Sequence, residues 1–553
     1  MTGRPLAALL AALAGTAAAG TGSGASADLP PPLPPPLAAD TPPPSTELPH
    51  GDALELLWGH RIDFSGGKPL VSIRLVEARD EVTVTTRGPA RLEPREATPV
   101  QVAAGARLRV RVRRGVPAAV SWRPLLAQFE ARDRAGVERA RAAWAARGVQ
   151  TRTRSTGGVY GIAGHVIDNR RTLVLADGTF TEATAATFAA DAWRRWGERP
   201  EATADVEVRP AGLVEVLGAK GEILATGDRV VVLDGRAEGF TLDDRAYRGR
   251  LHLTVDAVGR LAAVLALPLE DLLRGLVPSE MPAGSPAEAL RAQAVTARSN
   301  VLAQIGTRHL DEPWSICSDV HCQAYRGEGA QVASTDAAVR ATAGEALFAV
   351  VDGRLVDGVY SAMCGGHGED NDAVWGGTPS QSLRGRPDLG PADAAAWAGG
   401  LASEGRVAAF LADAPPAWCA RAPGAKPDRF RWERRIGAEK LDALLAPLGL
   451  GAVDDLAVVA RGASGRAIAL RVDGERGSAT VHGELRIRRL LGDLPSAMFV
   501  LAPDREGWVF RGGGWGHGVG MCQWGAIGRA AAGQDYRRIL GAYFAGAEVA
   551  RIY

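Results

Sequence analysis

The chain has 553 residues, too many for one hydrophobic core, so we expect several domains. Hydrophobic residues make up 46% of it and charged residues 23%, which are ordinary globular values and exclude a disordered or fibrous chain. The formal net charge of +1 gives no polyanion-steering field, and no basic run with interleaved aromatic residues indicates a nucleic-acid partner.

The first 27 residues have the pattern of a secretory signal peptide. Arg4 precedes an apolar run that ends near Gly20, and Ala25-Ser-Ala27 forms a small-x-small cleavage site. The run is too short to cross a bilayer, and no later stretch reaches about eighteen unbroken apolar residues. We therefore expect an exported protein, periplasmic or extracellular and associated with the cell wall, without a transmembrane segment.

Three segments follow the predicted signal peptide. Residues 28–50 are proline-dense and predict an extended linker. Residues 51–125 alternate in short runs, as in Leu108–Arg113, and predict a β-rich module. Residues 126–205 predict the order β-α-β-β-α, with helices over Arg132–Ala146 and Thr181–Trp196. This order resembles a SPOR-like or ferredoxin-like module, a type that binds glycan strands stripped of peptides. The alternative is a plain scaffold of that shape.

From residue 206 to residue 553 we expect one larger domain. A predicted strand over Asp244–Val255 and a second from Ala263 lead into a helix that precedes Glu280. Helices and strands are interspersed without strict β-α-β alternation, so the predicted fold class is α+β and multi-domain.

A single carboxylate stands out after that helix. Glu280 lies between Pro278 and Pro282, so we expect it in a rigid apolar loop that is not helical, an arrangement typical of a functional site. The alternative is a glutamate that only favours the dipole of the next helix. Arg291 and Arg298 share a face of that next helix and could present cations beside Glu280, unless both are simply solvated.

The next helix has both ends marked in the sequence. Ser285 is expected to cap it, with Pro286 at the first helical position and Glu288 completing a capping box. Gly306 is placed to end it. Apolar residues recur at helical spacing along one face: Leu290, Ala294, Ala297, Val301 and Ile305.

The five cysteines all lie in the C-terminal half: Cys317, Cys322, Cys364, Cys419 and Cys522. An odd number in an exported protein leaves at least one unpaired, metal-bound or paired between chains. Cys317 and Cys322, with His309 and His321, could bind zinc tetrahedrally. Ligation by both adjacent residues, His321 and Cys322, would need a strained loop, and a Cys317–Cys322 disulfide is the alternative.

Two glycine-rich segments carry further candidates. In the first, Gly365 and Gly366 would let the backbone approach a ligand closely, His367 is a polar candidate, and Cys364 could be a nucleophile. The second, residues 512–525, follows a predicted strand but matches neither G-x-G-x-x-G nor a P-loop. Its three candidates for one wall of a sugar cleft are Trp515, His517 and Gln523. The alternative for this segment is a compact turn.

Taken in order, these motifs resemble the SpoIID/LytB family. The resemblance rests on Leu-x-Gly-x-Val-Pro-x-Glu-Met-Pro, Glu-Ala-Leu-Arg-Ala-Gln-Ala-Val-x-Ala-Arg, Cys-Gln-x-Tyr, Cys-Gly-Gly and Gly-Trp-Gly-His-Gly-Val-Gly-Met-x-Gln-x-Gly-Ala, over residues 245–553. It implies an exported peptidoglycan-active protein, because sporulation members are lytic transglycosylases that cut denuded glycan strands. LytB-type members were described as amidase enhancers, so a glycan-binding amidase enhancer is the alternative function.

The resemblance also implies roles for individual residues. The catalytic glutamate falls on Glu280 and the helix arginine on Arg298, which would orient the carboxylate or bind the muramyl lactate. We expect substrate contacts from the other motif residues: Arg291, Tyr325, Ser361, Gly365, Gly366, His367, Trp515, His517 and Gln523. Some members bind zinc where this chain has His309, Cys317, His321 and Cys322, and others lack it, so we expect no required cofactor: a structural zinc is optional, and the Cys317–Cys322 disulfide stays open. Cys364 and Cys522 stand where many members have serine, which argues against a cysteine nucleophile.

One carboxylate suffices for this chemistry. Ordinary glycosidases need two, whereas a lytic transglycosylase closes the C6 hydroxyl of muramic acid onto C1 in place of water. The expected partners are peptidoglycan glycan strands and an N-acetylmuramoyl-L-alanine amidase. The apolar surroundings of Glu280 favour a raised pKa, whereas the nearby helix N-terminus and arginines oppose it.

Overall fold

The computed structural model describes residues 52–162, 165–198, 200–319 and 321–553. The predicted signal peptide and proline-rich linker lie outside this part of the chain. Within it, no helix has the length and apolar character needed to span a bilayer. This part of the chain contains both helices and strands, and the strands form several sheets, so the predicted α+β class is confirmed.

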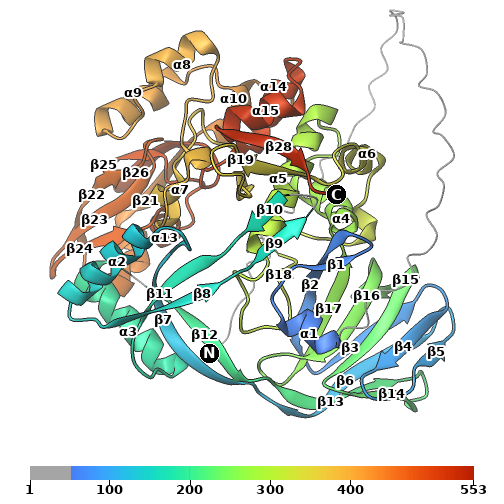
Figure 1. The fold of residues 1–553 in the computed structure, drawn as a ribbon. Helices are drawn as coiled ribbons and strands as arrows, with labels where there is room; N and C mark the ends of the chain where they lie inside the picture. Colours follow the sequence, from blue (N-terminus) through green and yellow to red (C-terminus); the bar gives the residue numbers. More distant parts are fainter. Residues whose placement is uncertain (1–51, 163–164, 199, 320) are drawn as a thin grey trace, which may run out of the picture. The chain divides into compact units, whose positions relative to one another are not determined.

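A twelve-stranded sheet organises the first part of the described chain (Figure 1). Its main path runs β1-β2-β17-β16-β15-β3-β6-β13-β14, with β4, β5 and β18 at its sides. The strands are β1 (Asp63–Ser65), β2 (Lys68–Arg79), β3 (Glu81–Thr86), β4 (Ala90–Pro94), β5 (Val100–Val102), β6 (Arg107–Val116), β13 (Ala211–Leu217), β14 (Ile223–Asp228), β15 (Val230–Leu242), β16 (Arg245–Val255), β17 (Leu261–Pro268) and β18 (Ile316–Cys317). A short helix, α1 (Ala53–Trp58), precedes them.

This sheet does not divide where the sequence suggested. β2 pairs with β17, placing Ile73 opposite Leu265, and β6 pairs with β13. The predicted 51–125 module and the start of the predicted 206–553 domain therefore share one sheet and one hydrophobic core. Local alternation of residues indicates strands but carries no record of which distant strand completes the pairing.

Residues 119–208 form a separate four-stranded sheet, and in sequence this segment lies between β6 and β13 of the larger sheet. Its strands are β7 (Ala119–Glu130), β8 (Thr151–Thr156), β11 (Arg171–Ala176) and β12 (Glu201–Val208), in the order β12-β7-β11-β8. Helices α2 (Arg134–Ala146) and α3 (Glu182–Trp196) match the two predicted helices, and β9 (Val159–Ile162) and β10 (His165–Asp168) form a hairpin. The succession β-α-β-β-α-β, with the β9–β10 hairpin set aside, is that of a ferredoxin-like unit, and it begins at Ala119 and ends with one more strand, β12, than the predicted order.

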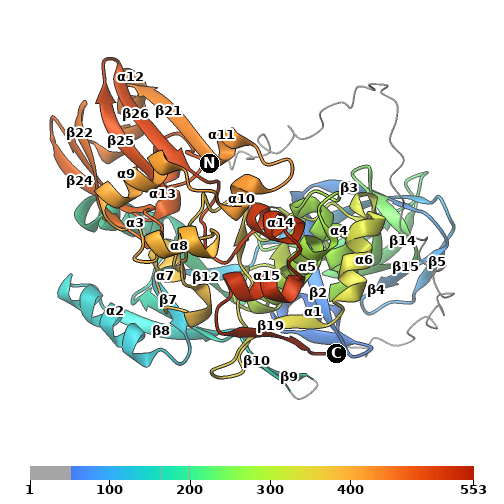
Figure 2. The same ribbon diagram turned by 90° about the horizontal axis from the view of Figure 1, so that it is seen from above.

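Helix α5 (Ala287–Gln304) lies at the centre of the second part of the fold and is buried on nearly all sides. It contacts α4 (Leu269–Glu280), α6 (Ala333–Ala341), α14 (Gln523–Ala531) and α15 (Tyr536–Tyr543) (Figure 2). Its predicted start is wrong, because Pro286 is the N-cap and no side chain caps the helix. Glu288 instead accepts the backbone N–H of Tyr536. The predicted end is confirmed, since Gly306 follows with φ of +76°.

Residues 371–513 form a region with its own helices and strands. It contains sheets β21-β26-β25 and β22-β23-β24. Its elements are α7 (Asn371–Trp375), α8 (Pro391–Trp397), α9 (Glu404–Asp413), α10 (Trp418–Arg421), α11 (Pro427–Phe430), α12 (Ala438–Leu445), α13 (Glu484–Leu490), β21 (Arg431–Gly437), β22 (Val453–Arg461), β23 (Ala467–Gly474), β24 (Gly477–His482), β25 (Phe499–Asp504) and β26 (Gly507–Gly513).

The chain leaves for this region and returns from it at one place. β20 (Tyr360–Ser361) pairs in parallel with β27 (Met521–Cys522), so the segments on either side lie against each other. β19 (Glu345–Ala349), which precedes β20, pairs with β28 (Ala547–Arg551), which follows β27. Both glycine-rich motifs are thereby brought to the side of α5.

Candidate active site

Glu280 is the last residue of helix α4. The predicted non-helical loop is therefore wrong: the helix continues through Pro278, and Met281 donates its N–H to Val277. A proline is tolerated here because it lies in the final turn, where only one helical hydrogen bond is lost. The Ser279 hydroxyl adds a bond back to the Gly275 carbonyl, which supports that turn.

Backbone and side-chain donors hold the half-buried Glu280. The N–H of Ala324 donates to its Oε1 at 2.9 Å. The Gln523 amide donates to the Glu280 carbonyl at 3.2 Å and to Oε1 of Gln293 at 3.3 Å. The Tyr360 hydroxyl donates to Oε1 of Gln323 at 3.3 Å. Uncharged glutamine and tyrosine side chains thus form a hydrogen-bond network at Glu280, and the charge of Arg326 also acts on its carboxylate.

The pKa of Glu280 lies above the ordinary value of a glutamate. Burial is the main cause, whereas the Ala324 N–H and the side chains of Tyr360 and Gln523 lower the pKa. Desolvation disfavours the charged form of a carboxylic acid and here outweighs the hydrogen bonds to it. The group is consequently poised to hold a proton at a higher pH than an exposed glutamate does.

The second glycine-rich segment lies next to Tyr360. Nε2 of His517 donates to the Tyr360 carbonyl at 2.9 Å, and its Nδ1 accepts the N–H of Val519 at 3.0 Å. Burial lowers the pKa of His517 to about 3, so the ring is neutral. The ring of Trp375 lies 5.0 Å from that of His517 and is 55% exposed. An exposed aromatic side chain therefore lies beside His517, which in turn is bonded to the Tyr360 backbone.

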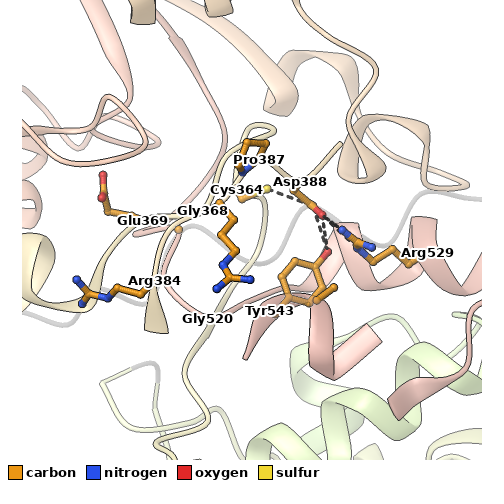
Figure 3. Close-up of a pocket in the computed structure, with 12 residues that line it drawn as sticks. Cys364, Gly368, Glu369, Arg384, Pro387, Asp388, Gly520, Arg529 and Tyr543 are labelled. Carbon is orange, nitrogen blue, oxygen red and sulfur yellow. Dashed lines mark hydrogen bonds and ion pairs between the residues drawn. The ribbon is translucent and has the colours of Figure 1, made fainter. Parts of the chain in front are cut away.

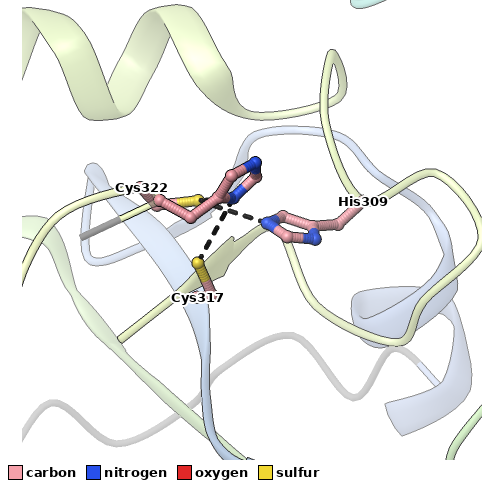
Figure 4. Close-up of side chains that lie close together, drawn as sticks. His309, Cys317 and Cys322 are labelled. Atoms are coloured by element: carbon pink, nitrogen blue, oxygen red, sulfur yellow. Dashed lines mark hydrogen bonds between the residues drawn. The ribbon is translucent and has the colours of Figure 1, made fainter. Parts of the chain in front are cut away.

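The four candidate metal ligands converge. One donor atom from each of His309, Cys317, His321 and Cys322 lies within 4.8 Å of all the others (Figure 4). Nε2 of His309 is 3.2 Å from Sγ of Cys322, and Nδ1 of His321 is 3.6 Å from Sγ of Cys317. Tetrahedral zinc places nitrogen and sulfur ligands about 3.5 Å apart, so the donor set fits the ion.

The loop accommodates both adjacent ligands. Of the four residues, His309 has a left-handed backbone conformation, with φ of +52°. His321 and Cys322, where a strained loop was expected, do not have a positive φ. Cys317 is fixed by the pairing of β18 with β2, and both cysteines are free thiols in the structure. Two residues after Cys322, the chain reaches Ala324, whose N–H binds Glu280.

Comparison with known proteins agrees with this arrangement. Residues 257–348, which include Glu280, helix α5 and the His309–Cys322 loop, match the family described as stage II sporulation protein, SpoIID. The chain contains a SpoIID-family domain. Residues 369–520 match a family described as a domain of unknown function. This second match begins and ends between β20 and β27, so it corresponds to the region that interrupts the site.

Two curated relatives span about half of this chain. An uncharacterized protein of Brachyspira hyodysenteriae is 28% identical over 56% of this chain and 74% of its own length. The amidase enhancer of Bacillus subtilis is 26% identical over 50% of this chain and 39% of its own length. A crystal structure of an exported protein from Burkholderia pseudomallei is 19% identical, covering 30% of this chain and 27% of that one, with a TM-score of 0.17, too low to assign a shared fold.

In the SpoIID-family domain, Arg298 does not lie against Glu280. It is fully buried, and Nε and Nη2 each donate to the Glu270 carboxylate at 2.8 Å while Nη1 donates to the Glu345 carbonyl. The expectation that it orients Glu280 or meets substrate is therefore not supported, because all its donors face the interior. Arg291, expected beside it, pairs with Glu288 at the helix surface.

Several other predicted contact residues are part of the packing. Tyr325 is buried against Tyr247. The hydroxyl of Ser361, also buried, accepts the N–H of Gly518. A Cβ on Gly365 would meet the Gly513–Gly514 backbone at 2.9 Å, and one on Gly366 would meet Phe410 at 3.0 Å. These glycines permit close approach of protein to protein rather than to a ligand.

The predicted cysteine nucleophile is also not supported. Cys364 is buried, and its thiol faces Asp388 and Cys419. His367 is buried too, but its Nδ1 donates to the Gly368 carbonyl and its Nε2 has no partner in the described structure. His367 is therefore not placed to activate the thiol, and the group that the thiol meets is the buried Asp388 carboxylate.

Sequence reasoning missed four members of the site. Gln293 and Gln323 lie within the recognised motifs, and Tyr360 and Trp375 lie on either side of the Cys-Gly-Gly motif. A glutamine in an otherwise apolar stretch was an available signal for the first two, since a buried amide needs a hydrogen-bond partner. Of the predicted residues, Glu280, His517 and Gln523 are brought together. Trp515, two residues before His517, packs against the guanidinium of Arg429.

Proposed function

We propose that this protein acts in cell-wall remodelling, as a lytic transglycosylase that cuts the glycan strands of peptidoglycan with Glu280 as acid and base. The observation that carries the proposal is the desolvated carboxyl group of Glu280, whose pKa stays raised although hydrogen bonds from uncharged groups and the charge of Arg326 lower it. The SpoIID-family match and the relative named amidase enhancer support a role at the cell wall.

The site needs only two proton transfers. Protonated Glu280 gives its proton to the glycosidic oxygen as the bond from that oxygen to C1 breaks. The resulting carboxylate, held by the Ala324 N–H, then takes the proton of the C6 hydroxyl as that oxygen bonds to C1. The products are a 1,6-anhydro ring and a free hydroxyl on the leaving sugar, and Glu280 regains its proton. No second carboxylate is required, in contrast to hydrolysis by a glycosidase.

Trp375 and His517 supply the surface for a sugar ring. An exposed indole presents an apolar face that suits the C–H face of a pyranose, and the neutral His517 fixes the strand that carries Tyr360. Trp375→Ala should weaken glycan binding with little change in stability, because most of its side chain is exposed.

His309, Cys317, His321 and Cys322 would hold a structural zinc ion. All four positions of a tetrahedral ion would be filled by protein, so the metal would hold the loop that ends at Ala324 in place. Zinc content of the purified chain measures this directly: Cys317→Ser should lower it by one equivalent. Unchanged zinc in a folded Cys317→Ser protein would rule the site out.

The function is tested with denuded glycan strands. Wild-type protein should release fragments that end in 1,6-anhydromuramic acid, detected by mass spectrometry, and Glu280→Gln should release none while still binding insoluble glycan. This isosteric variant keeps the Ala324 contact, so its folding can be matched to wild type by thermal melting. Wild-type protein that binds strands without forming anhydro ends would contradict the enzyme.

An amidase enhancer is the second candidate, favoured by the name of the Bacillus subtilis relative. It predicts faster release of stem peptides by an N-acetylmuramoyl-L-alanine amidase when this protein is added. If Glu280→Gln stimulates the amidase as well as wild type does, and neither forms anhydro ends, the enhancer is the function.

A further inference from the structure

A second cluster of metal-binding side chains lies outside the site described above. It consists of Cys364, Asp388, Cys419 and Cys522, all buried, with one donor atom of each within 4.8 Å of the others. The four come from separate elements: the loop after β20, the loop before α8, helix α10, and β27. Figure 3 shows Cys364 directed toward Asp388 beside a cavity of about 20 Å³.

The separations are those of ligands on one ion. Sγ of Cys364 lies 3.8 Å from Sγ of Cys419 and 3.4 Å from Oδ2 of Asp388. Tetrahedral zinc, with bonds of about 2.3 Å to sulfur and about 2.1 Å to oxygen, places two sulfurs about 3.8 Å apart and sulfur and oxygen about 3.5 Å apart. These two separations match those of zinc ligands, and the remaining donor atoms lie within 4.8 Å of one another.

The surroundings of the cluster are prepared for anionic ligands. Sγ of Cys522 accepts the N–H groups of Cys364 and Gly525, each at 3.2 Å, and Sγ of Cys364 accepts that of Gly366 at 3.4 Å. Such bonds from backbone amides favour a thiolate over a thiol.

Asp388 is held as a second-sphere network would hold a ligand. Arg529 donates twice to its Oδ1, at 2.9 and 3.2 Å, and the Tyr543 hydroxyl also bonds the carboxylate (Figure 3). The same hydroxyl lies 3.1 Å from Oδ2, which is also 3.4 Å from Sγ of Cys364. Hydrogen bonds that orient a ligating carboxylate are a common outer-sphere device.

A buried cation nearby lacks a carboxylate partner within the described residues. The guanidinium of Arg431 donates only to the backbone carbonyls of Leu411, Gly365, Phe430 and Phe410. A largely buried positive charge needs compensation, and zinc with three thiolates and one carboxylate carries two negative charges. Arg431 and Arg529 together balance that charge.

We propose that Cys364, Asp388, Cys419 and Cys522 bind a structural zinc ion that fastens the inserted region to the active site. Two ligands, Asp388 and Cys419, belong to the 369–520 region. The other two flank it: Cys364 lies in the loop after β20, and Cys522 lies on β27, which leads into Gln523. The ion closes the point where the chain leaves the SpoIID-like core and returns to it. Because the four ligands are buried, no position remains for substrate, as in structural zinc sites.

The competing arrangement is a disulfide between two of the three cysteines. A disulfide joins its sulfurs at about 2.05 Å and would leave the third thiol and Asp388 buried together without a function. It also would not use the carboxylate that Arg529 and Tyr543 position. The convergence of all four donors favours the ion.

Zinc content of the full chain distinguishes the two. Wild type, Cys419→Ser and Cys317→Ser are purified with zinc, freed of loose metal by gel filtration, and measured by mass spectrometry of the element. Cys419→Ser should contain one equivalent less than wild type, whether or not the His309–Cys322 site is also filled. Cys317→Ser serves as the matched control for that other site, and the double variant should lose both equivalents.

Two outcomes would overturn the proposal. One is a folded Cys419→Ser protein, by circular dichroism, whose zinc content equals that of wild type. The other is a disulfide among Cys364, Cys419 and Cys522, found by alkylating the denatured, unreduced protein and mapping its peptides. If Cys419→Ser fails to fold, cobalt titration of the folded Cys317→Ser protein decides. One equivalent should produce the absorption of tetrahedral cobalt with thiolate ligands, and its absence would exclude the site.

Discussion

At the scale of single residues, the chemistry depends on what surrounds Glu280 rather than on Glu280 alone. A glutamate at the end of a helix in water would be ionised at neutral pH. Here burial raises its pKa, and the groups that oppose this are the Ala324 N–H, Tyr360, Gln523 and the charge of Arg326. These groups come from three separate stretches of the chain, so the acid is made by their assembly.

Removing the Tyr360 hydroxyl tests this balance. Because that hydroxyl lowers the pKa of Glu280, Tyr360→Phe should raise the pKa further. The proton donor is then lost at a higher pH, so the alkaline limb of the transglycosylase pH profile should move upward. Tyr536→Phe, which removes a hydroxyl bonded to Glu345, should leave the limb in place. A downward shift in Tyr360→Phe would contradict the assignment.

We expect Arg298 to stabilise the fold rather than to take part in catalysis. Arg298→Met leaves the Glu270 carboxylate buried without its bidentate partner and should reduce the free energy of unfolding by about 3–5 kcal/mol. Urea denaturation measures this. Arg291→Met breaks a surface pair with Glu288 and should cost about 0.5 kcal/mol or less. An Arg298→Met protein of normal stability but without activity would instead indicate a direct catalytic role.

At the scale of elements, two local rules gave opposite results. The positions that end α5 followed the sequence, since Gly306 adopts the left-handed conformation expected after a helix. The proline rule failed at Pro278, because the last turn of α4 packs beneath the motif loops and loses only one hydrogen bond. The predicted capping box is also wrong, since Glu288 accepts the N–H of Tyr536, the first residue of α15, rather than a donor of its own helix. Tertiary contacts decide wherever the local preference is small.

The Cys-Gly-Gly turn gives a prediction at this scale. Gly365 has φ of +77°, and its Cβ position lies 2.9 Å from the Gly513–Gly514 backbone, so Gly365→Ala should destabilise the protein by about 1–3 kcal/mol. Gly541 lies inside α15 with no atom near its Cβ position, so Gly541→Ala should stabilise it by about 0.4–1 kcal/mol. Thermal melts of the two variants should shift in opposite directions, and equal shifts would contradict the structure.

At the scale of the whole molecule, the SpoIID-family match ends near β19, and the site is completed from elsewhere. Glu280 and α5 come from residues 257–348, Tyr360 from β20, and Gln523 from the segment after the 369–520 region. The large sheet is likewise built from strands that are distant in sequence. Both assemblies require the long-range pairings to form together.

A truncation tests that dependence. A chain of residues 206–553, the predicted domain, lacks β2, β3 and β6 and should expose the edges of β17, β15 and β13. Unpaired strand edges promote aggregation, so this chain should lack a cooperative melt and run as aggregate in gel filtration. A chain of residues 52–553 keeps every pairing and is the control. A folded monomer of 206–553 would show that the large sheet is dispensable.

The sequence by itself determined the fold class, the two helices of the 119–208 unit and the family resemblance. It also singled out Glu280 as a candidate, although not its helical conformation. These follow from composition, periodicity and ordered motifs, which are properties of neighbouring residues. Only the tertiary structure decided that 51–125 belongs to the large sheet, that Arg298 pairs with Glu270, and that three cysteines and an aspartate meet. Those outcomes depend on contacts between residues far apart in the chain, where strand pairing, burial and charge compensation select partners that no local pattern encodes.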